Sequence, residues 1–492
     1  MVDARAAALL SGALWPLAFA PFSQGYLTPL LLALLFLLWL QDGRVGRGWL
    51  LGLLFGLGQF GFGVFWIFNA IHRFGHAPLP AALLLTALFF LTLSLFPAAV
   101  GAAAVFLARR LESRDRKLFL FALLWNIGEW LRGWLFPWLE AGYSQLGGPL
   151  AGYAPLFGSY GVGLAVALTA SGMVAVTLEG RRAAPWMLGL LWLWLLAALF
   201  DQVVWWREAG QPFQATLIQG NIPQDLKWDR ERARWIFSTY LKLTREHLDA
   251  DLIVWPETAL PTFYHRAEAA LEPLRRELRA HGTDLLLGAP YRDPQTGRVY
   301  NGVVCLCETF GVYRKRHLVP FGEYLPLRPV TGWVLDLLKI PLSDFDAGPD
   351  RQPLLLAAGH PVGVTICYED AFARDVVWQL PEARYLVNVT NDAWFGGWLA
   401  PDQHLQMARM RAKETGRFLL RANNTGITAV IAPTGEVVAQ AKPFVRTALT
   451  EEIPPLAGTT PYVLWGDWGI AAIWLALSFR IVRRRQLEEE VE

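Results

Sequence analysis

The sequence predicts a polytopic α-helical membrane domain of about eight spans, joined to an α/β domain. Only 20 of the 86 charged residues lie in the first 202 of its 492 positions. Overall, 54% of the residues are hydrophobic, above the 45–50% that is roughly usual in soluble domains. The rest of the chain alternates short apolar runs with polar segments of helical spacing, which is typical of α/β domains. A fully soluble protein is excluded.

Eight apolar stretches are long enough to be transmembrane helices. A helix needs about 20 mostly apolar residues to cross a bilayer, because the hydrocarbon core offers no water to its backbone. Seven stretches precede residue 205 and one closes the chain, at about 6–22, 26–40, 48–71, 80–108, 117–136, 158–178, 185–201 and 462–482. The sequence therefore predicts a membrane domain over 1–204, and a last span with a basic cytoplasmic tail over 461–492.

Loop charges predict the orientation, because short cytoplasmic loops carry the excess of Lys and Arg. The N-terminus, every second loop and the tail carry this excess, at Arg5, Arg44, Arg47, Arg109–Lys117, Arg181, Arg182 and Arg483–Arg485. The alternate loops carry little more than Arg73. Seven crossings from a cytoplasmic N-terminus place residues 205–460 outside the cytoplasm.

Composition excludes several kinds of partner and cofactor site. With 44 Lys+Arg and 42 Asp+Glu the net charge is +2, so we expect no nucleic-acid partner. Three cysteines are too few for a disulfide scaffold, and they lack the spacing of a zinc site. Cys305 and Cys307 share a face of a predicted strand and are expected to be buried structural thiols. We expect no metal and no cofactor.

Residues 205–460 contain the predicted α/β domain. Apolar runs predict strands at 213–220, 250–257, 283–290, 301–310, 360–370 and 383–392, and a late hairpin at 426–433 and 436–441. Helical spacing with charge predicts helices at 229–248, 266–281 and 401–417.

Three reactive residues stand at or just after strand ends, where the active sites of α/β proteins gather. They are Glu257, Lys315 and Cys367. A thiol becomes a nucleophile when a base takes its proton or a nearby cation stabilises its thiolate. Glu257 can supply the base, and Lys315 a charge that stabilises both the thiolate and a tetrahedral oxyanion. The set suits acyl transfer through a thioester.

The motifs around these residues resemble a known family. Glu257 in WPET, Lys315 in YRKRHL and Cys367 in ICYED are similar to the Glu-Lys-Cys triad of the nitrilase (carbon–nitrogen hydrolase) superfamily. The triad alone would identify only the superfamily. The layout of spans and further motifs resemble the apolipoprotein N-acyltransferase family over essentially the full length: APF, EWLRGWLF, GNIPQDLKW, PFGEYLP, NDAWFG and HLQMARMRA.

This resemblance implies a fold, a reaction and supporting residues. The fold is an αββα sandwich over 205–460, on the periplasmic side of a bacterial inner membrane. The reaction moves an acyl chain from a phospholipid to a thioester on Cys367, and then to the N-terminal amine of diacylglyceryl-cysteine in an apolipoprotein. The family pattern implies four supporting residues in the active site, Trp228, Glu323, Tyr368 and Glu369.

Two ionisable residues lie inside the fifth predicted span. Glu129 and Arg132 are three positions apart, and so share one helix face. Ionisable groups within a span commonly mark a functional site, here a pocket for a lipid head group. An ion pair that merely packs the helix bundle is an equally good interpretation.

A candidate lipid lid is predicted within 327–343. Trp333, Leu337 and Ile340 fall at i, i+4 and i+7, which gives a helix one apolar face. Such a segment can dip into the outer leaflet and guide acyl chains to Cys367. The alternative is a short helix packed into the domain core. Residues 391–401, rich in Trp and Phe, are a second candidate arm.

Two other functions remain possible. A membrane-anchored amidase or nitrilase would use the same triad with water as the acceptor, although small soluble amides require neither eight spans nor EWLRGWLF. A transporter or lipid-binding protein with an inactive outer domain predicts a degraded triad, whereas all three members are present.

Overall fold

The computed structural model describes residues 3–227, 229, 231–326 and 344–489. The chain divides into two compact units. The helical unit comprises Met1–Phe65, Leu83–Val204 and Leu464–Glu492, and the α/β unit comprises Trp66–Ala82 and Trp205–Val463. The segment 66–82 thus belongs to the α/β unit, although it lies between two apolar helical regions in the sequence.

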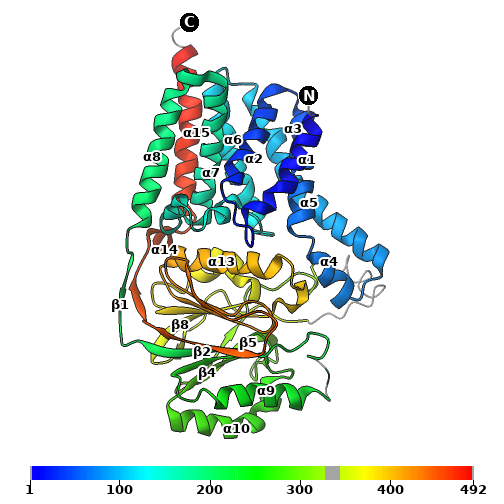
Figure 1. Ribbon diagram of the computed structural model, residues 1–492, viewed down its shortest axis with the longest axis vertical. Helices are drawn as coiled ribbons and strands as arrows, with labels where there is room; N and C mark the ends of the chain where they lie inside the picture. Colours follow the sequence, from blue (N-terminus) through cyan, green and yellow to red (C-terminus); the bar gives the residue numbers. More distant parts are fainter. Residues whose placement is uncertain (1–2, 228, 230, 327–343, 490–492) are drawn as a thin grey trace. The chain divides into compact units, whose positions relative to one another are not determined.

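The helical unit is built from apolar helices rich in Leu and Ala, which have high helix propensity (Figure 1). They are α1 (Ala4–Leu14), α2 (Leu27–Gln41), α3 (Val45–Gly63), α5 (Leu79–Ala108), α6 (Arg114–Gly133), α7 (Ala154–Glu179), α8 (Ala184–Asp201) and α15 (Trp468–Glu489). Glycine allows α1 and α3 to approach closely. A Cβ on Gly12 would collide with the carbonyl oxygen of Phe55, and one on Gly58 with that of Leu9.

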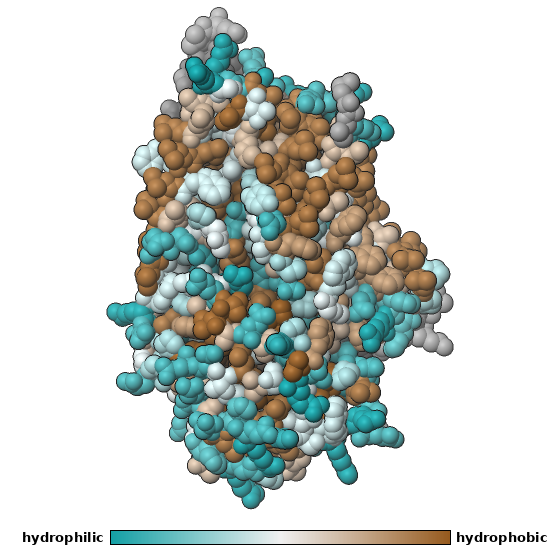
Figure 2. Space-filling view, in the orientation of Figure 1, coloured by the Kyte–Doolittle hydropathy of each residue, from teal (hydrophilic) through white to brown (hydrophobic). Residues whose placement is uncertain are grey.

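Length and composition identify two described helical stretches able to cross a membrane, Leu79–Ala108 and Pro149–Asp201. A third is added if Val45–Gly63 and Ile67–Phe74, which are bent by 63°, form one span. Figure 2 shows hydrophobic side chains over much of the visible surface of the helical unit. The helical character of the N-terminal region is confirmed, whereas eight spans stay a prediction.

The helix of the predicted span 48–71 is broken after Gly63. α3 ends at Gly63, and the chain turns into the short α4 (Ile67–Asn69) and the π-helical turn η2 (Ala70–Phe74). These pack on the 3-10 turn η7 (Asp392–Phe395) of the same unit. The Nδ2 of Asn69 donates to the carbonyl oxygen of Trp394 at 3.1 Å, and the rings of Trp66 and Phe395 are 4.6 Å apart. This packing holds the segment out of the straight helix that its hydrophobicity suggests.

Two six-stranded sheets form the centre of the α/β unit (Figure 1). The first has the order β13-β2-β3-β4-β5-β6, with β2 (Phe213–Gln219), β3 (Leu252–Val254), β4 (Asp284–Arg292), β5 (Val299–Leu306), β6 (Gly311–Arg314) and β13 (Thr447–Ile453). The second has the order β12-β11-β10-β9-β8-β7, with β7 (Leu355–Ala357), β8 (His360–Ile366), β9 (Tyr385–Thr390), β10 (Leu419–Asn423), β11 (Ala429–Ile431) and β12 (Val437–Gln440). A separate pair joins β1 (Trp206–Glu208) to β14 (Leu456–Gly458).

Helices cover one face of each sheet, which gives a four-layered αββα arrangement (Figure 1). α9 (Ala233–Arg245) and α10 (Tyr264–His281) pack on the first sheet, and α12 (Ala373–Val377) and α13 (Ala400–Thr415) on the second. Leu271, Leu274 and Leu278 of α10 recur at helical spacing and are buried against Leu285 and Leu287 of β4. The two apolar cores fix the sheets whose strand ends carry the candidate site.

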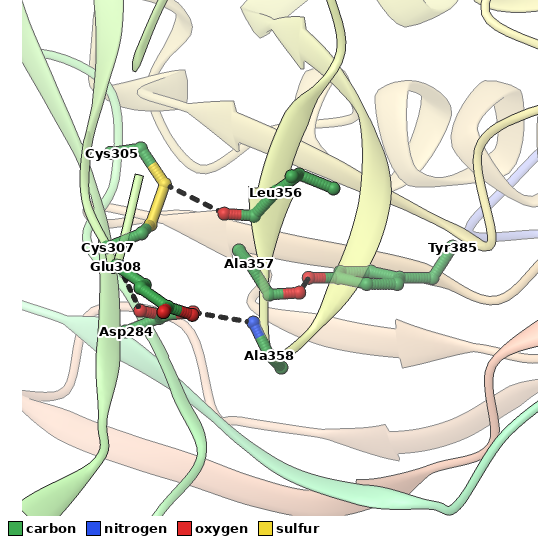
Figure 3. Close-up of a disulfide and its surroundings, with 8 residues drawn as sticks. All are labelled: Asp284, Cys305, Cys307, Glu308, Leu356, Ala357, Ala358 and Tyr385. Atoms are coloured by element: carbon green, nitrogen blue, oxygen red, sulfur yellow. Dashed lines mark hydrogen bonds between the residues drawn. A yellow bond between two sulfur atoms is a disulfide. The ribbon is translucent and has the colours of Figure 1, made fainter. Parts of the chain in front are cut away.

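Cys305 and Cys307 form a disulfide, which corrects the expectation of free buried thiols (Figure 3). β5 ends at Leu306, between the two, and their Cα atoms are 5.2 Å apart. That separation is within the range a disulfide spans and is shorter than the roughly 6.5 Å of two steps along a regular strand. Nearby, Asp284 of β4 accepts the backbone N–H of Ala358 at 2.8 Å.

Candidate active site

Cys367 occupies a strained turn at the carboxyl end of β8, where the 3-10 helix η6 (Cys367–Ala371) begins. Its φ of 53° lies in the left-handed region, which costs a non-glycine residue about 1–3 kcal/mol. Asn388 of β9 restrains this turn, because its Nδ2 donates to the carbonyl oxygen of Cys367 at 3.0 Å. Sharp strand-to-helix turns of this kind present a nucleophile in several hydrolase folds.

Glu257, Lys315 and Glu323 form a buried charged group. The Nζ of Lys315 lies 2.8 Å from Glu323 Oε2 and 3.6 Å from Glu257 Oε1. Asn301 of β5 donates its Nδ2 to Oε1 of both carboxylates, at 2.8 Å each. The carbonyl oxygen of Asn301 also accepts the backbone N–H of Lys315 at 2.8 Å. One asparagine therefore fixes two carboxylates and the lysine between them.

The strands of the first sheet position this group. Glu257 lies just after β3, and Lys315 just after β6. The chain at Glu257 passes so close to β4 that a Cβ on Gly288 would lie 2.8 Å from the Glu257 Cα. Glu323 is held in its own turn, since its Oε2 accepts the N–H of Val319 at 2.8 Å.

Burial and charge shift the pKa of two members of the site in the same direction. Burial lowers the pKa of Lys315, but the carboxylates of Glu323 and Glu257 outweigh this effect, so the pKa rises and the ammonium stays charged. Burial raises the pKa of the Cys367 thiol, and the charge of Glu257 raises it further, against the opposing effect of Lys315. The thiol is therefore protonated at neutral pH and requires a base.

Tyr368 and Glu369 follow Cys367 in η6, and both are buried. The Glu369 carboxylate accepts the N–H groups of Ile366 at 2.7 Å, Arg316 at 2.6 Å and His317 at 3.1 Å. Burial raises the pKa of Glu369 to about 7. Its contacts bind the turn at Cys367 to the segment that follows Lys315.

Sequence reasoning missed two residues of this site, Asn301 and Lys227. Lys227 is 2% exposed and donates its Nζ to the carbonyl oxygen of Glu257 at 2.9 Å. Burial lowers the pKa of Lys227 to about 8, against the charges of Glu257 and Cys367. The sequence signals for both were weak. Lys227 stands beside apolar neighbours in GNIPQDLKW, and Asn301 lies in an otherwise apolar strand.

Four residues named from the sequence cannot be placed. Trp228, and the candidate lid residues Trp333, Leu337 and Ile340, lie outside the described residues. Across the described ranges, no group of three or more His, Cys, Asp or Glu side chains is arranged to hold a metal ion.

Glu129 and Arg132 belong to α6 of the helical unit and are both buried. They do not form an ion pair with each other in the described structure. Glu129 Oε1 accepts the N–H of Ala141 at 2.8 Å, and Arg132 Nη1 donates to two carbonyl oxygens, of Phe136 and Trp138, at 2.6 Å. Glu129 Oε2 and Arg132 Nη2 find no hydrogen-bond partner among the described residues. Both residues line a pocket with Gln59, Phe96, Pro97, Val100, Trp125 and Gly128.

Two parts of the chain match known protein families. Residues 11–172 match the family described as apolipoprotein N-acyltransferase N-terminal domain, and residues 214–462 match the carbon-nitrogen hydrolase family. Among solved structures, the C. elegans NitFhit protein matches with a TM-score of 0.39 and 18% identity, over 52% of this chain and 62% of that one.

Curated relatives match over nearly the whole chain. The apolipoprotein N-acyltransferase of Methylococcus capsulatus is 49% identical over 487 residues, 97% of this chain and 96% of that protein. The protein of the same name from Nitrosomonas europaea is 43% identical over 460 residues, 91% of each chain. The resemblance inferred from the motifs is confirmed, as is the nitrilase-like fold of the C-terminal half. The chain therefore belongs to the apolipoprotein N-acyltransferase family.

Proposed function

We propose that this chain transfers an acyl chain from a membrane phospholipid to the N-terminal amine of diacylglyceryl-cysteine in apolipoproteins. The intermediate is a thioester on Cys367, and the product is a triacylated lipoprotein. The observation that carries the proposal is the buried group of Glu257, Lys315 and Glu323, in which the charges of Glu257 and Lys315 act on Cys367. Membership of the acyltransferase family over nearly the full length supports the choice of substrates.

In the first half-reaction, the sulfur of Cys367 attacks the ester carbonyl of the phospholipid. Glu257 takes the thiol proton as the carbon–sulfur bond forms. The ammonium of Lys315 stabilises the negative charge that develops on the carbonyl oxygen. The ester carbon–oxygen bond then breaks, and the proton held by Glu257 passes to the departing lysophospholipid.

In the second half-reaction, the lipoprotein amine attacks the thioester and loses a proton to Glu257. The carbon–sulfur bond breaks, the amide forms, and the thiol of Cys367 recovers the proton. Glu323 and Asn301 keep Lys315 oriented through both steps, since they bind its Nζ and its backbone N–H. Tyr368 and Glu369 hold the turn on which Cys367 stands, and Trp228 is a further active-site residue in this proposal.

A membrane-anchored amidase would need the same three groups, with water as the acceptor. The match of residues 11–172 to the N-terminal domain of the acyltransferase family favours transfer. A hydrolase for small soluble amides has no use for that region.

We further propose eight spans, with residues 205–460 on the periplasmic side of a bacterial inner membrane and residues 461–492 returning to the cytoplasm. The Lys and Arg excess of alternate loops supports this orientation. The disulfide between Cys305 and Cys307 supports it independently, because disulfides persist in oxidising compartments.

The pocket at Glu129 and Arg132 is proposed to bind the polar head of a zwitterionic phospholipid. A carboxylate oxygen and a guanidinium nitrogen without partners complement an ammonium and a phosphate. Glu129→Gln keeps an acceptor for the N–H of Ala141 and removes only the charge. We expect it to raise the KM for the phospholipid several-fold with kcat unchanged. The control Glu179→Gln, at a half-buried carboxylate that pairs with Arg114, should change neither. An unchanged KM in Glu129→Gln would exclude the pocket.

Trp333, Leu337 and Ile340 are proposed to form a lid that admits acyl chains. Trp333→Ser combined with Leu337→Lys should impair acylation of Cys367 from phospholipid vesicles, yet leave acylation by a short-chain, water-soluble thioester intact. Equal losses on both donors would mean that the segment belongs to the domain core.

The central test uses purified protein, phospholipid vesicles and a synthetic diacylated lipopeptide. Mass spectrometry should detect an acyl group on Cys367, and then a lipopeptide heavier by one acyl chain. Cys367→Ala should give neither product, and Glu257→Gln should not form the acyl-enzyme. Release of free fatty acid without the triacylated lipopeptide would identify a hydrolase instead.

A further inference from the structure

Four charged side chains lie buried beside the Cys367 turn and have no part in the proposed reaction. This charge cluster comprises Asp370, Asp392, His404 and Arg421, each at most 1% exposed. The four come from different elements, η6, η7, α13 and β10. Burying charges is costly unless each is paired and hydrogen-bonded, so their arrangement must be closely matched.

His404 joins the two carboxylates of the cluster. Its Nε2 lies 2.8 Å from Asp370 Oδ1, and its Nδ1 lies 2.9 Å from Asp392 Oδ1. Only an imidazolium can donate to both oxygens. A neutral ring with its proton on Nε2 would accept a hydrogen bond from Arg421 Nη2, which is 2.8 Å from Nδ1, but the same lone pair would then face Asp392 Oδ1 at 2.9 Å.

Charge balance also favours the imidazolium. Two carboxylates and two cations sum to zero, whereas a neutral His404 leaves a buried net charge of −1. Burial and the neighbouring Arg421, whose Nη2 is 2.8 Å from Nδ1, lower the pKa of His404, but Asp370 and Asp392 outweigh them and raise it to about 8.

Other charges near α13 are occupied elsewhere. α12 contributes Asp375, whose carboxylate binds the ring of His317 at 3.0 Å and the guanidinium of Arg316 at 3.4 Å. Within α13 itself, Arg411 pairs with Glu414 at 2.8 Å. The neighbouring charges that shift the pKa of His404 most are those of Arg421, Asp370 and Asp392.

The cluster is connected to Cys367 by two hydrogen bonds. Arg421 Nη1 donates to Asp370 Oδ2 and to Asn388 Oδ1, both at 2.8 Å. Asn388 Nδ2 in turn donates to the carbonyl oxygen of Cys367. Asn388, which restrains the left-handed turn, is thus itself oriented by the guanidinium of Arg421. His404 and its two carboxylate partners surround that guanidinium.

We propose that His404, as an imidazolium, is a positioning residue that holds the Cys367 turn in its reactive conformation through the charge cluster and Asn388. Loss of its proton turns Nδ1 from a donor to Asp392 into an acceptor for Arg421 Nη2. The ring then repels Asp392 and draws the guanidinium toward itself, so Asn388 no longer fixes the turn. The effect opposes ordinary thiol chemistry, in which reactivity rises with pH. This inference rests on the proposed function only in the experiment that measures acylation of Cys367.

The test compares wild type with His404→Gln across pH 6 to 9.5. Alkylation by iodoacetamide reports Cys367 without any acyl donor, because the other two of the three cysteines form the disulfide. The ratio of the wild-type rate to the variant rate should be about tenfold or more at pH 6.5. It should fall toward one with an inflection near pH 8. The rate of acyl-enzyme formation from phospholipid should give the same ratio.

Two further variants make the test decisive. His247→Gln removes a histidine bonded only to a helix carbonyl, that of Leu243 at 2.8 Å, and should give a ratio near one at every pH. Asp392→Asn removes one of the carboxylates that raise the pKa of His404. The inflection in the pH profile of Cys367 alkylation should therefore lie at lower pH in this variant than in wild type. This variant also decides the matter if His404→Gln does not fold.

A ratio independent of pH in His404→Gln would reduce His404 to a structural role and overturn the proposal. If the inflection stays near pH 8 in Asp392→Asn, it belongs to another titrating group, such as Lys227, and the proposal is overturned as well. If alkylation follows the expected profile but phospholipid never acylates Cys367, the proposed function fails while this inference stands.

Discussion

Asn301 is the residue on which the candidate site depends most without taking part in the chemistry. Its single Nδ2 binds both Glu257 and Glu323, and its carbonyl oxygen holds the backbone of Lys315. No sequence pattern distinguished it, because its role depends on carboxylates 44 and 22 positions away.

Asn301→Ala should therefore slow acyl-enzyme formation at pH 7. Two buried carboxylates lose a donor, at about 1–3 kcal/mol for each, so a loss of about 10²-fold or more is expected, at roughly 1.4 kcal/mol per tenfold. Single-turnover kinetics with labelled phospholipid measures the rate, and circular dichroism checks the fold. A rate within about twofold of wild type would contradict the bridging role of Asn301.

The pKa of His404 makes a separate prediction about stability. Because the folded-state pKa of about 8 exceeds the ordinary value of 6.5, the stabilisation is fully present below pH 6.5 and is lost as pH rises through 8. The shift corresponds to about 2 kcal/mol. The difference in thermal midpoint between wild type and His404→Gln should therefore shrink between pH 6.5 and 9. A constant difference would show that the ring is not charged in the folded protein.

At the level of elements, the disulfide closes a loop of only three residues at the end of β5. Loop-closure entropy for so short a loop limits its contribution to about 1–2 kcal/mol. Replacing both Cys305 and Cys307 by Ser should lower the thermal midpoint by a few degrees and leave acyl transfer unchanged, because neither sulfur belongs to the buried charged group. Loss of activity in a folded double variant would give the disulfide a part in the reaction.

Some elements were predictable from the sequence and others were not. Strands β2, β4 and β8 are buried runs of apolar residues, a signal that neighbouring positions carry by themselves. β10 and β13 were missed. β10 contains Arg421, whose charge suggests a surface position until Asp370 and Asp392 are known to surround it. β13 has a half-buried glutamate, Glu451, and an exposed one, Glu452, and it pairs antiparallel with β2 from more than 200 residues away.

For the whole molecule, the proposed topology predicts which positions a membrane-impermeant reagent can reach. A cysteine at Gln295, exposed in the turn between β4 and β5, should react with an impermeant maleimide added to intact spheroplasts. One at Arg114, exposed at the start of α6, should react only after lysis. The Cys367→Ala background removes the free thiol. The reverse pattern would place the catalytic domain in the cytoplasm.

The sequence alone determined the class of the protein and its reactive groups. Apolar length and loop charge predicted a helical N-terminal region, and strand ends with WPET, YRKRHL and ICYED identified Glu257, Lys315 and Cys367 as the candidate triad. These signals are local, because hydrophobic periodicity and strand ends are properties of adjacent residues.

Only the tertiary structure decided which polar side chains meet. Asn301 bridges two carboxylates, Lys227 approaches Glu257, and the charge cluster is hydrogen-bonded through Asn388 to the turn at Cys367. Taken singly, each of these residues suggests an ordinary surface or cap position. Their roles arise because folding excludes water from the site, where an unpaired charge is so costly that each group must find a partner distant in the sequence.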